Sequence, residues 1–303
     1  MYRLFDYIFG RPKSTKANEK GDAEGELGDE GTSDTASNDL IGPLEFPNDC
    51  GGPASGFDLV FVHGLCGSRL KTWTRDSVFW PRDLLKEDLK NVRVVTWGYG
   101  TNIANASTYG NEESLFGHAT ALLNDLARLR QGITRPIIFI CHGLGGLVVK
   151  QALITSDSYN ALGGHTALSE IYGRTSGVVF MGTPHRGISR ESYSQIAAKI
   201  AKLSLDRPND HLLETLRPDS DILDKQREDF TRISKEMAIV CIREELPTGV
   251  VLVVPEASAS YDGFNVACGA IHANHMDMVK FATRDRGYNR ALGHIRNIMD
   301  AKL

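Results

Sequence analysis

Residues 137–149 read Ile-Ile-Phe-Ile-Cys-His-Gly-Leu-Gly-Gly-Leu-Val-Val, and the order of residue types in this stretch decides the fold. Residues 137–140 form a short apolar run rich in β-formers, which is typical of a buried strand. A glycine-rich turn follows at residues 143–146, and apolar residues at helical spacing begin with Leu147. The stretch therefore predicts a strand that turns sharply into a helix.

Similar short apolar runs recur along the chain on both sides of this stretch. Six strands are predicted, at residues 58–62, 92–97, 137–140, 178–181, 238–242 and 250–254. Helical patterns lie between them, the clearest with Leu115, Ala119, Leu122 and Leu126 on one face. Strands that alternate with helices predict an α/β fold, with a mostly parallel sheet and helices on both faces.

The chain divides by composition into a leader and one large domain. Residues 1–55 are mostly Gly, Ser, Thr, Asn, Asp, Glu and Lys, so we expect a disordered acidic leader. Residues 56–303 are expected to form the α/β domain. Within it, residues 187–236 contain helical patterns but no strand, which predicts a helical lid insertion.

Charge and composition exclude several classes of protein. The 34 Lys and Arg residues are outnumbered by 38 Asp and Glu, so the chain has no basic excess for nucleic acid. The five cysteines contain no C-x-x-C pair, and we therefore expect neither a zinc site nor a disulfide framework, and no cofactor. No apolar run is long enough to span a bilayer.

The start of the chain bears on location. Residues 1–12 combine aromatic and aliphatic side chains with Arg3 and Arg11, but their apolar stretch is too short for a signal peptide. We expect an intracellular protein, in the cytoplasm first of all, with mitochondrial or membrane association as the alternatives. Contact of residues 1–12 with a membrane surface would be peripheral at most.

Gly143 has three interpretations. In the first, it only relieves strain in a tight strand-to-helix turn. A dinucleotide-binding loop fails, because Val148 stands where that fingerprint needs its third glycine. In the third, residues 141–145 are a nucleophile elbow, G-x-S-x-G in pattern, in which glycine has replaced the nucleophilic serine.

Motifs elsewhere in the chain favour the third interpretation. They are Val62-His63-Gly64-Leu65, Lys71-Thr72-Trp73, residues 79–85, residues 143–150, Gly182-Thr183-Pro184-His185-Arg186-Gly187 and residues 274–278. Together they resemble the lipase-like serine esterases, a family that includes the serine active site-containing protein and the N-terminal domains of some fungal NOD-like receptors. The resemblance covers about Phe57 to Tyr288 and implies an α/β-hydrolase fold. The family has serine at the position of Gly143.

The resemblance and the order of elements suggest the other parts of a catalytic site. His275 follows the last predicted strand and matches the family's histidine, so it is the expected base. Glu244 follows the strand before it and is the expected acid, with Glu245 as a close competitor and Asp262 as a weaker one.

The expected oxyanion hole consists of backbone N–H groups. We assign it to Leu65, after the first core strand, and to Leu144, just past the elbow. His63 and His142 stand at strand ends, where we expect structural roles. Cys141 lies two positions before Gly143, still in the strand, so we expect no substitute nucleophile.

These features support two hypotheses of function. The first is a lipase- or esterase-like hydrolase for acyl esters, which is catalytically impaired because Gly143 lacks the serine hydroxyl. The alternative is a non-catalytic signalling module on the same fold that binds a lipid-like ligand or a protein partner. In both cases we expect an acyl ester or lipid-like ligand and no nucleic acid.

Overall fold

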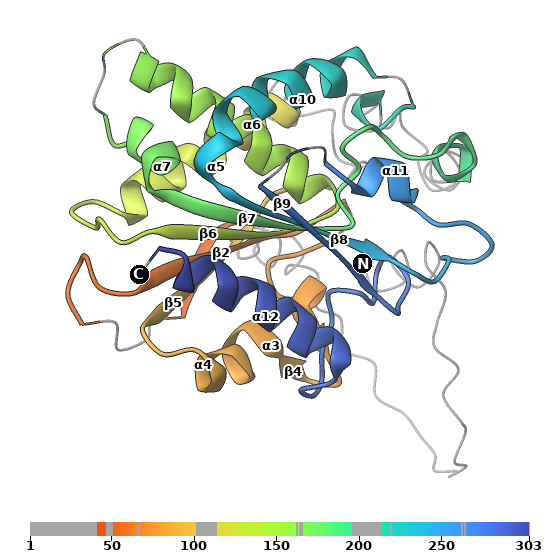
Figure 1. The fold of residues 1–303 in the computed structure, drawn as a ribbon, viewed down its shortest axis with the longest axis horizontal. Helices are drawn as coiled ribbons and strands as arrows, with labels where there is room; N and C mark the ends of the chain where they lie inside the picture. The colour runs from red at the N-terminus through yellow and green to blue at the C-terminus, as the bar shows by residue number, and fades with distance from the viewer. Residues whose placement is uncertain are drawn as a thin grey trace, which may run out of the picture.

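The computed structural model describes residues 41–46, 51–65, 67–100, 114–161, 163, 166–195, 214–218, 220–261, 263 and 265–302. Its centre is a seven-stranded sheet in the order β1-β5-β2-β6-β7-β8-β9 (Figure 1). The strands are β1 (Gly42–Phe46), β2 (Phe57–Val62), β5 (Val92–Gly98), β6 (Ile137–His142), β7 (Thr175–Met181), β8 (Ala238–Glu244) and β9 (Val266–Ile271). β1 is antiparallel to β5, and the other neighbours are parallel.

Helices cover both faces of the sheet, as the sequence predicts. The helices are α3 (Trp80–Asp83), α4 (Leu85–Asp88), α5 (Leu115–Leu129), α6 (Leu144–Ala161), α7 (Ser169–Arg174), α10 (Asp221–Ile233), α11 (Glu256–Ala259) and α12 (Arg286–Asp300). Helices α5, α6, α7 and α10 lie on one face, and α3, α4 and α12 on the other (Figure 1). Short 3-10 helices, η1 (Lys71–Trp73) and η4 (Ser234–Glu236), and a hairpin of β3 (Thr74–Arg75) and β4 (Val78–Phe79), complete the described elements.

Burial on both faces of the sheet explains why the central strands are mostly apolar. Every residue of β2, β5, β6 and β7 is buried, because each of these strands has helices above and below it. Helices α5 and α12 begin at side-chain caps. Ser114 accepts from the Gly117 N–H at 3.0 Å, and Asp285 accepts from the Tyr288 N–H at 2.8 Å. The predicted α/β architecture is confirmed.

Three boundaries predicted from the sequence are wrong. The first is the end of the leader at residue 55, because Gly42–Phe46 forms β1 and pairs with β5. Only three of its five residues are apolar, which suits an edge strand that is partly exposed. Residues 1–40 and 47–50 lie outside the described residues. In the described part of the chain, no helix combines the length and the apolar character needed to span a bilayer.

The second wrong boundary concerns the last strand. Residues 250–254 form no strand: Val250 is 86% exposed, and a single bridge joins Thr248 to Val251. The seventh strand is instead β9, whose sequence Val-Ala-Cys-Gly-Ala-Ile gives a weak β signal because of its glycine and alanines. It is an edge strand with exposed residues, so it lacks the apolar run that marks the buried strands.

The third wrong boundary is the end of the predicted lid at residue 236. α10 packs against α6 on the body of the domain, where the Gln226 side chain donates to the Leu147 carbonyl at 3.0 Å. Its leucine and phenylalanine side chains, Leu223 and Phe230, belong to the main core. Residues 196–213, in the middle of the predicted lid, lie outside the described residues, so an insertion there stays a prediction.

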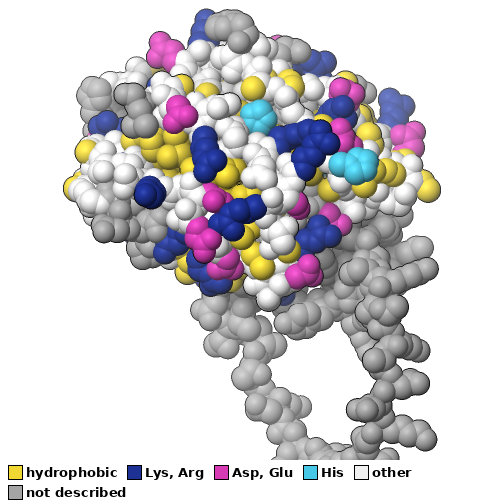
Figure 2. All heavy atoms as spheres, turned by 60° about the horizontal axis from the view of Figure 1, so that its bottom comes forward, with side chains coloured by type: hydrophobic (Ala, Val, Ile, Leu, Met, Phe, Trp, Pro, Cys, Tyr) yellow, Lys and Arg dark blue, Asp and Glu magenta, His cyan; other side chains and the backbone are white. Residues whose placement is uncertain are grey.

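Charged side chains on the α12 side of the molecule alternate in sign. Figure 2 turns this side forward and shows Lys and Arg interspersed with Asp and Glu. Arg284 illustrates the pattern, because it donates to Glu87 at 2.6 Å and to Asp88 at 2.8 Å, which joins the segment before α12 to α4. Such exposed pairs contribute little to stability individually.

A buried ion cluster joins three segments at the opposite end of the sheet from the elbow. Asp58, in β2, is fully buried and accepts a bidentate pair of hydrogen bonds from Arg93 at 2.8 and 2.6 Å. Arg130 also donates to Asp58, and Arg135 lies 3.6 Å from it. A single carboxylate therefore faces three buried guanidinium groups, while Glu45 pairs with Arg93 from the exposed side.

Lys150, on α6, is a second buried charge with a different environment. Its ammonium lies 5.5 Å from the Phe230 ring centroid and 5.4 Å from that of Tyr261. Among the described residues, it has no hydrogen-bond partner. Burial lowers the pKa of Lys150 to about 7, nearby Cys241 opposes that shift, and Arg227 adds to it.

We expect Asp58→Asn to destabilise the fold strongly, because it leaves three buried arginines without their carboxylate. The expected loss is about 3 to 5 kcal/mol in the free energy of unfolding, measured by urea denaturation. Glu45→Gln is the matched control, since it removes a more exposed carboxylate from the same Arg93. That change should cost no more than about 1 kcal/mol. Equal losses in the two variants would contradict the role given to Asp58.

We expect Lys150→Met to stabilise the fold, and to do so more at about pH 7 than at about pH 9.5. The unfolded lysine holds its proton up to its ordinary pKa of 10.5, whereas the folded one, with its pKa lowered by burial, releases it near 7. The stability of the parent chain therefore rises with pH across this window, and the benefit of methionine shrinks. The expected gain at neutral pH is on the order of 3 kcal/mol by urea denaturation. Lys225→Met, on the exposed side of α10, should show no such pH dependence.

Candidate functional site

The elbow lies where β6 ends and α6 begins. Gly143 stands between His142 and Leu144 with φ at +50°, and its N–H donates to the Met181 carbonyl at 3.0 Å. This left-handed conformation is strained for a residue with a side chain and is accessible to glycine. The geometry therefore agrees with a sharp strand-to-helix turn, as the sequence predicts.

The glycines of the elbow differ in what surrounds them. A Cβ atom on Gly145 would overlap the His63 carbonyl oxygen, and one on Gly146 would overlap Thr183 Oγ1. A Cβ atom on Gly143 would instead meet His275 Nε2 first, at 3.3 Å, and then Gly64 Cα at 3.8 Å. Packing thus requires glycine at 145 and 146, whereas a Cβ atom at 143 would point at His275 and need its ring to shift by only a few tenths of an ångström.

His275 and Glu244 are in direct contact. His275 Nδ1 lies 2.6 Å from Glu244 Oε2, and both side chains are buried. Because a carboxylate only accepts, Nδ1 donates to Glu244, and Nε2 faces Gly143. This is the relation that a base and its orienting acid have in a hydrolase site.

Backbone groups hold Glu244 in place. Its Oε1 atom accepts from the N–H of Val253 at 2.5 Å and from that of Val254 at 3.2 Å. Glu244 is the last residue of β8 and only 1% exposed, so these donors replace the water that a buried carboxylate would lose. The stretch wrongly predicted as a strand is therefore the loop that fixes the acid.

Of the two competing acids, one lies elsewhere and one cannot be placed. Glu245 pairs with His272 at 3.2 Å, and the His272 side chain is 78% exposed. Asp262 lies outside the described residues. The structure thus brings Glu244, rather than Glu245, to His275, while the catalytic roles of both His275 and Glu244 stay predictions.

Two further histidines frame the site without offering a free base. His142 Nε2 lies 3.0 Å from the His275 carbonyl oxygen, and the two rings are 4.6 Å apart. Burial, followed by the neighbouring His275, lowers the pKa of His142 well below 6.5, so its neutral ring donates to that carbonyl. Burial also lowers the pKa of His63 to about 4, and its ring stacks on Tyr99 at 4.5 Å.

The expected oxyanion donors are on the two segments that flank Gly143. Leu144 is the first residue of α6, so its N–H has no acceptor within the helix. Leu65 lies in the turn after β2, which the Gly67 N–H to Gly64 carbonyl bond of 3.0 Å closes. Since Gly64 is the second neighbour of a Cβ at Gly143, this turn borders the elbow, and the assignment of both donors stays a prediction.

The sequence did not predict the hydrogen bonds that hold the site. His142 binds the His275 carbonyl, and the Val253 and Val254 N–H groups bind Glu244. No residue pattern could reveal the backbone donors, because any residue type supplies an N–H. The position of His142 at a strand end, directly before Gly143, does predict a structural role. It does not predict that its hydrogen-bond partner is the His275 carbonyl. The position of that partner depends on how the loop after β9 folds back.

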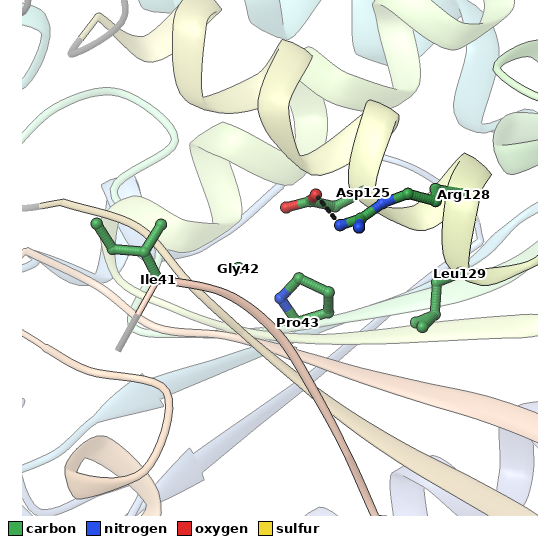
Figure 3. Close-up of a pocket in the computed structure, with 6 residues that line it drawn as sticks. All are labelled: Ile41, Gly42, Pro43, Asp125, Arg128 and Leu129. Carbon is green, nitrogen blue, oxygen red and sulfur yellow. Dashed lines mark hydrogen bonds and ion pairs between the residues drawn. The ribbon is translucent and has the colours of Figure 1, made fainter. Parts of the chain in front are cut away.

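An open cavity lies away from these residues. It has a volume of about 820 Å³ and is lined by Ile41, Gly42, Pro43, Asp125, Arg128 and Leu129. Figure 3 shows the Asp125–Arg128 ion pair on α5 beside the start of β1. Asp125 also accepts from Trp97 Nε1 at 2.8 Å, so its carboxylate is used within the fold. None of the candidate catalytic residues lines this cavity.

We expect Glu244→Ala to cost about 3 kcal/mol of unfolding free energy, because it leaves two backbone N–H groups and one imidazole N–H buried without acceptors. Urea denaturation measures the change. Glu245→Ala is the matched control: it removes a neighbouring carboxylate with a solvent-exposed partner and should cost less than about 1 kcal/mol. A larger loss in the control than in Glu244→Ala would show that the two glutamates were assigned in reverse.

Comparison with known sequences gives distant relatives. No protein-family model matches the chain. It is 27% identical over 274 residues to protein SERAC1 of Danio rerio, with 81% of this chain and 39% of the relative covered. Against protein SERAC1 of Homo sapiens the identity is 24% over 267 residues, with 80% and 39% covered. The chain thus spans about two fifths of the length of these curated relatives.

Comparison with solved structures supports the fold. The mature lipase BlEst2 of Bacillus licheniformis superposes with a TM-score of 0.56 at 16% identity, over 82% of this chain and 97% of that one. MGS-MChE2, an α/β-hydrolase enzyme from a sediment metagenome of the Mar Chica lagoon, gives a TM-score of 0.50 at 16% identity, over 85% and 95%. The mostly parallel sheet and its helices agree with these matches. The chain therefore has the α/β-hydrolase fold, and its likeness is to the lipase-like esterases.

Proposed function

We propose that this chain is an acyl-ester hydrolase domain that has lost its nucleophile and is catalytically impaired for that reason. One observation carries the proposal: a Cβ atom at Gly143 would first meet His275 Nε2 at 3.3 Å, while Glu244 binds the other nitrogen of the same ring at 2.6 Å. These distances support the roles proposed for Glu244 as acid and His275 as base to a serine hydroxyl at this position.

The chemistry that such a site performs in a serine hydrolase explains why the loss is severe. The base takes the proton of the hydroxyl as its oxygen attacks the ester carbonyl, and backbone N–H groups bind the oxyanion that forms. Without the hydroxyl, no acyl-enzyme can form at residue 143. In a hydrolase that lacks its triad, substrate orientation and the oxyanion donors alone still give a rate about 10³- to 10⁴-fold above that of the reaction in water.

No other described residue supplies a nucleophile at this position. Cys141 is the nearest thiol in the sequence, but it is fully buried in β6. Burial raises the pKa of Cys141 well above 9.0, which keeps it as an inert thiol. We therefore propose that hydrolysis in the parent chain uses a water molecule that His275 activates directly.

The substrate class follows from likeness and stays a proposal. The names of the matched structures include a lipase and an α/β-hydrolase enzyme, so an acyl ester or a lipid-like molecule is the ligand to test first. The absence of a hydroxyl at Gly143 favours a second function, in which the same site binds such a ligand or a protein partner without turning it over. The two functions differ in whether restoring serine restores chemistry.

We expect Gly143→Ser to gain reaction with a fluorophosphonate probe and to hydrolyse short-chain p-nitrophenyl esters at least about 10²-fold faster than the parent chain. The new hydroxyl would lie beside His275 Nε2, within hydrogen-bond reach. Because φ is positive at this position, the substitution should also cost about 1 to 2 kcal/mol of stability. Mass spectrometry of the labelled protein and steady-state kinetics measure the two gains.

Two controls make the result specific. Gly143→Ala adds the Cβ and the strain but no hydroxyl, so it should stay unlabelled. Gly143→Ser combined with His275→Ala should lose the gain, because the base is gone. Equal labelling of the parent and of Gly143→Ser would sink the proposal, since it requires another nucleophile. A folded Gly143→Ser that neither reacts nor turns over ester would favour the binding function.

A further inference from the structure

Two cysteines lie directly opposite each other on neighbouring strands. Cys241 of β8 and Cys268 of β9 are Cα partners in the parallel register. Partners in adjacent strands are about 4.8 Å apart, which falls within the Cα separation that a disulfide tolerates. Residues in register on parallel strands point to the same face, so the two thiols are neighbours.

The two thiols differ in exposure. Cys241 is 2% exposed and belongs to the main core, whereas Cys268 is exposed on the edge strand. Burial, followed by the adjacent Cys268, raises the pKa of Cys241 to about 12. An oxidant in solution therefore reaches Cys268 first, and Cys241 can react only with a partner that is already beside it.

From this arrangement we propose that Cys268 is an oxidation site and that Cys241 is its resolving thiol, so that hydrogen peroxide converts the pair into a reversible disulfide between β8 and β9. In the first step the Cys268 sulfur attacks the peroxide, the O–O bond breaks and a sulfenic acid forms with loss of water. The peroxide is reduced and the sulfur is oxidised by two electrons.

The second step needs no further oxidant. The Cys241 sulfur attacks the Cys268 sulfur, the S–S bond forms, the S–O bond breaks and a second water leaves. The thiol proton of Cys241 leaves with the departing hydroxide as that water, and His185 Nε2 lies 3.8 Å from Cys241 Sγ. The position of both sulfurs on paired strands gives this step the advantage of an intramolecular reaction.

The disulfide would join the two strands that lead to the candidate acid and base. β8 ends at Glu244, and the chain that leaves β9 at Ile271 reaches His275 four residues later. Oxidation would also remove the thiol that contacts His185, in the core next to Lys150. The inference does not depend on the proposed function, because thiol chemistry alone tests it.

The test uses the full chain with Cys50→Ser and Cys66→Ser, which removes the two cysteines outside the described residues. The protein is treated with hydrogen peroxide, denatured, alkylated with iodoacetamide and digested for mass spectrometry. We expect alkylation at Cys141 only, a linked pair of peptides containing Cys241 and Cys268, and recovery of both thiols after dithiothreitol. Without peroxide, all three cysteines should be alkylated.

Single variants assign the roles. With Cys268→Ser, the same treatment should leave Cys241 fully alkylated, because no sulfenic acid forms beside it. With Cys241→Ala, dimedone should trap Cys268 as the sulfenic acid. Cys141→Ser is the matched control and should form the disulfide as the parent does. Since Cys268 is on the surface, Cys268→Ser decides the test even where Cys241→Ala folds poorly.

Two results would overturn the inference. One is oxidation of Cys268 to the sulfinic acid while Cys241 stays fully alkylated, which means that the buried thiol does not resolve the intermediate. The other is a disulfide between Cys268 residues of two chains, visible as a dimer on a non-reducing gel. Either outcome would make Cys268 an ordinary exposed thiol.

Discussion

The first turn of α6 lies so close to the ends of β2 and β7 that Gly145 and Gly146 have no room for a side chain. This close approach sets the position of the helix N-terminus relative to the sheet. The chain turns directly before this helix, at Gly143, whose φ is positive. The site is therefore organised around a packing constraint of the backbone, and the side chain at 143 is not needed to maintain it.

Glu244 and His275 are likewise held by interactions that do not involve residue 143. Glu244 accepts from two backbone N–H groups, and the His275 carbonyl binds His142. A buried carboxylate and a buried imidazole keep these partners because leaving them unpaired would cost more than any one bond contributes. The arrangement of Glu244 and His275 thus needs no side chain at residue 143, and glycine adopts this φ without the strain that a serine would carry.

Buried charged groups elsewhere in the fold differ in how fully they are paired. Asp58 is surrounded by arginines, so its charge is compensated on several sides. In the described part of the chain, the Lys150 ammonium lies near two aromatic faces and has no hydrogen-bond partner, and its pKa moves toward neutrality instead. The first cluster stabilises the end of the sheet far from the elbow, while the second lies behind the elbow, next to Cys241 and His185.

The α/β architecture and the place of the elbow follow from the amino-acid sequence alone, because buried parallel strands must be apolar runs and a tight turn must contain glycine. The sequence also indicates His275 and Glu244 as candidates, since the ends of parallel strands meet at one edge of the sheet. The choice between Glu244 and Glu245 required the folded chain, because a shift of one residue turns a side chain to the opposite face. The placement of Val253 and Val254 in a loop rather than a strand also required the folded chain, because their backbone N–H groups bind a carboxylate that no local pattern reveals.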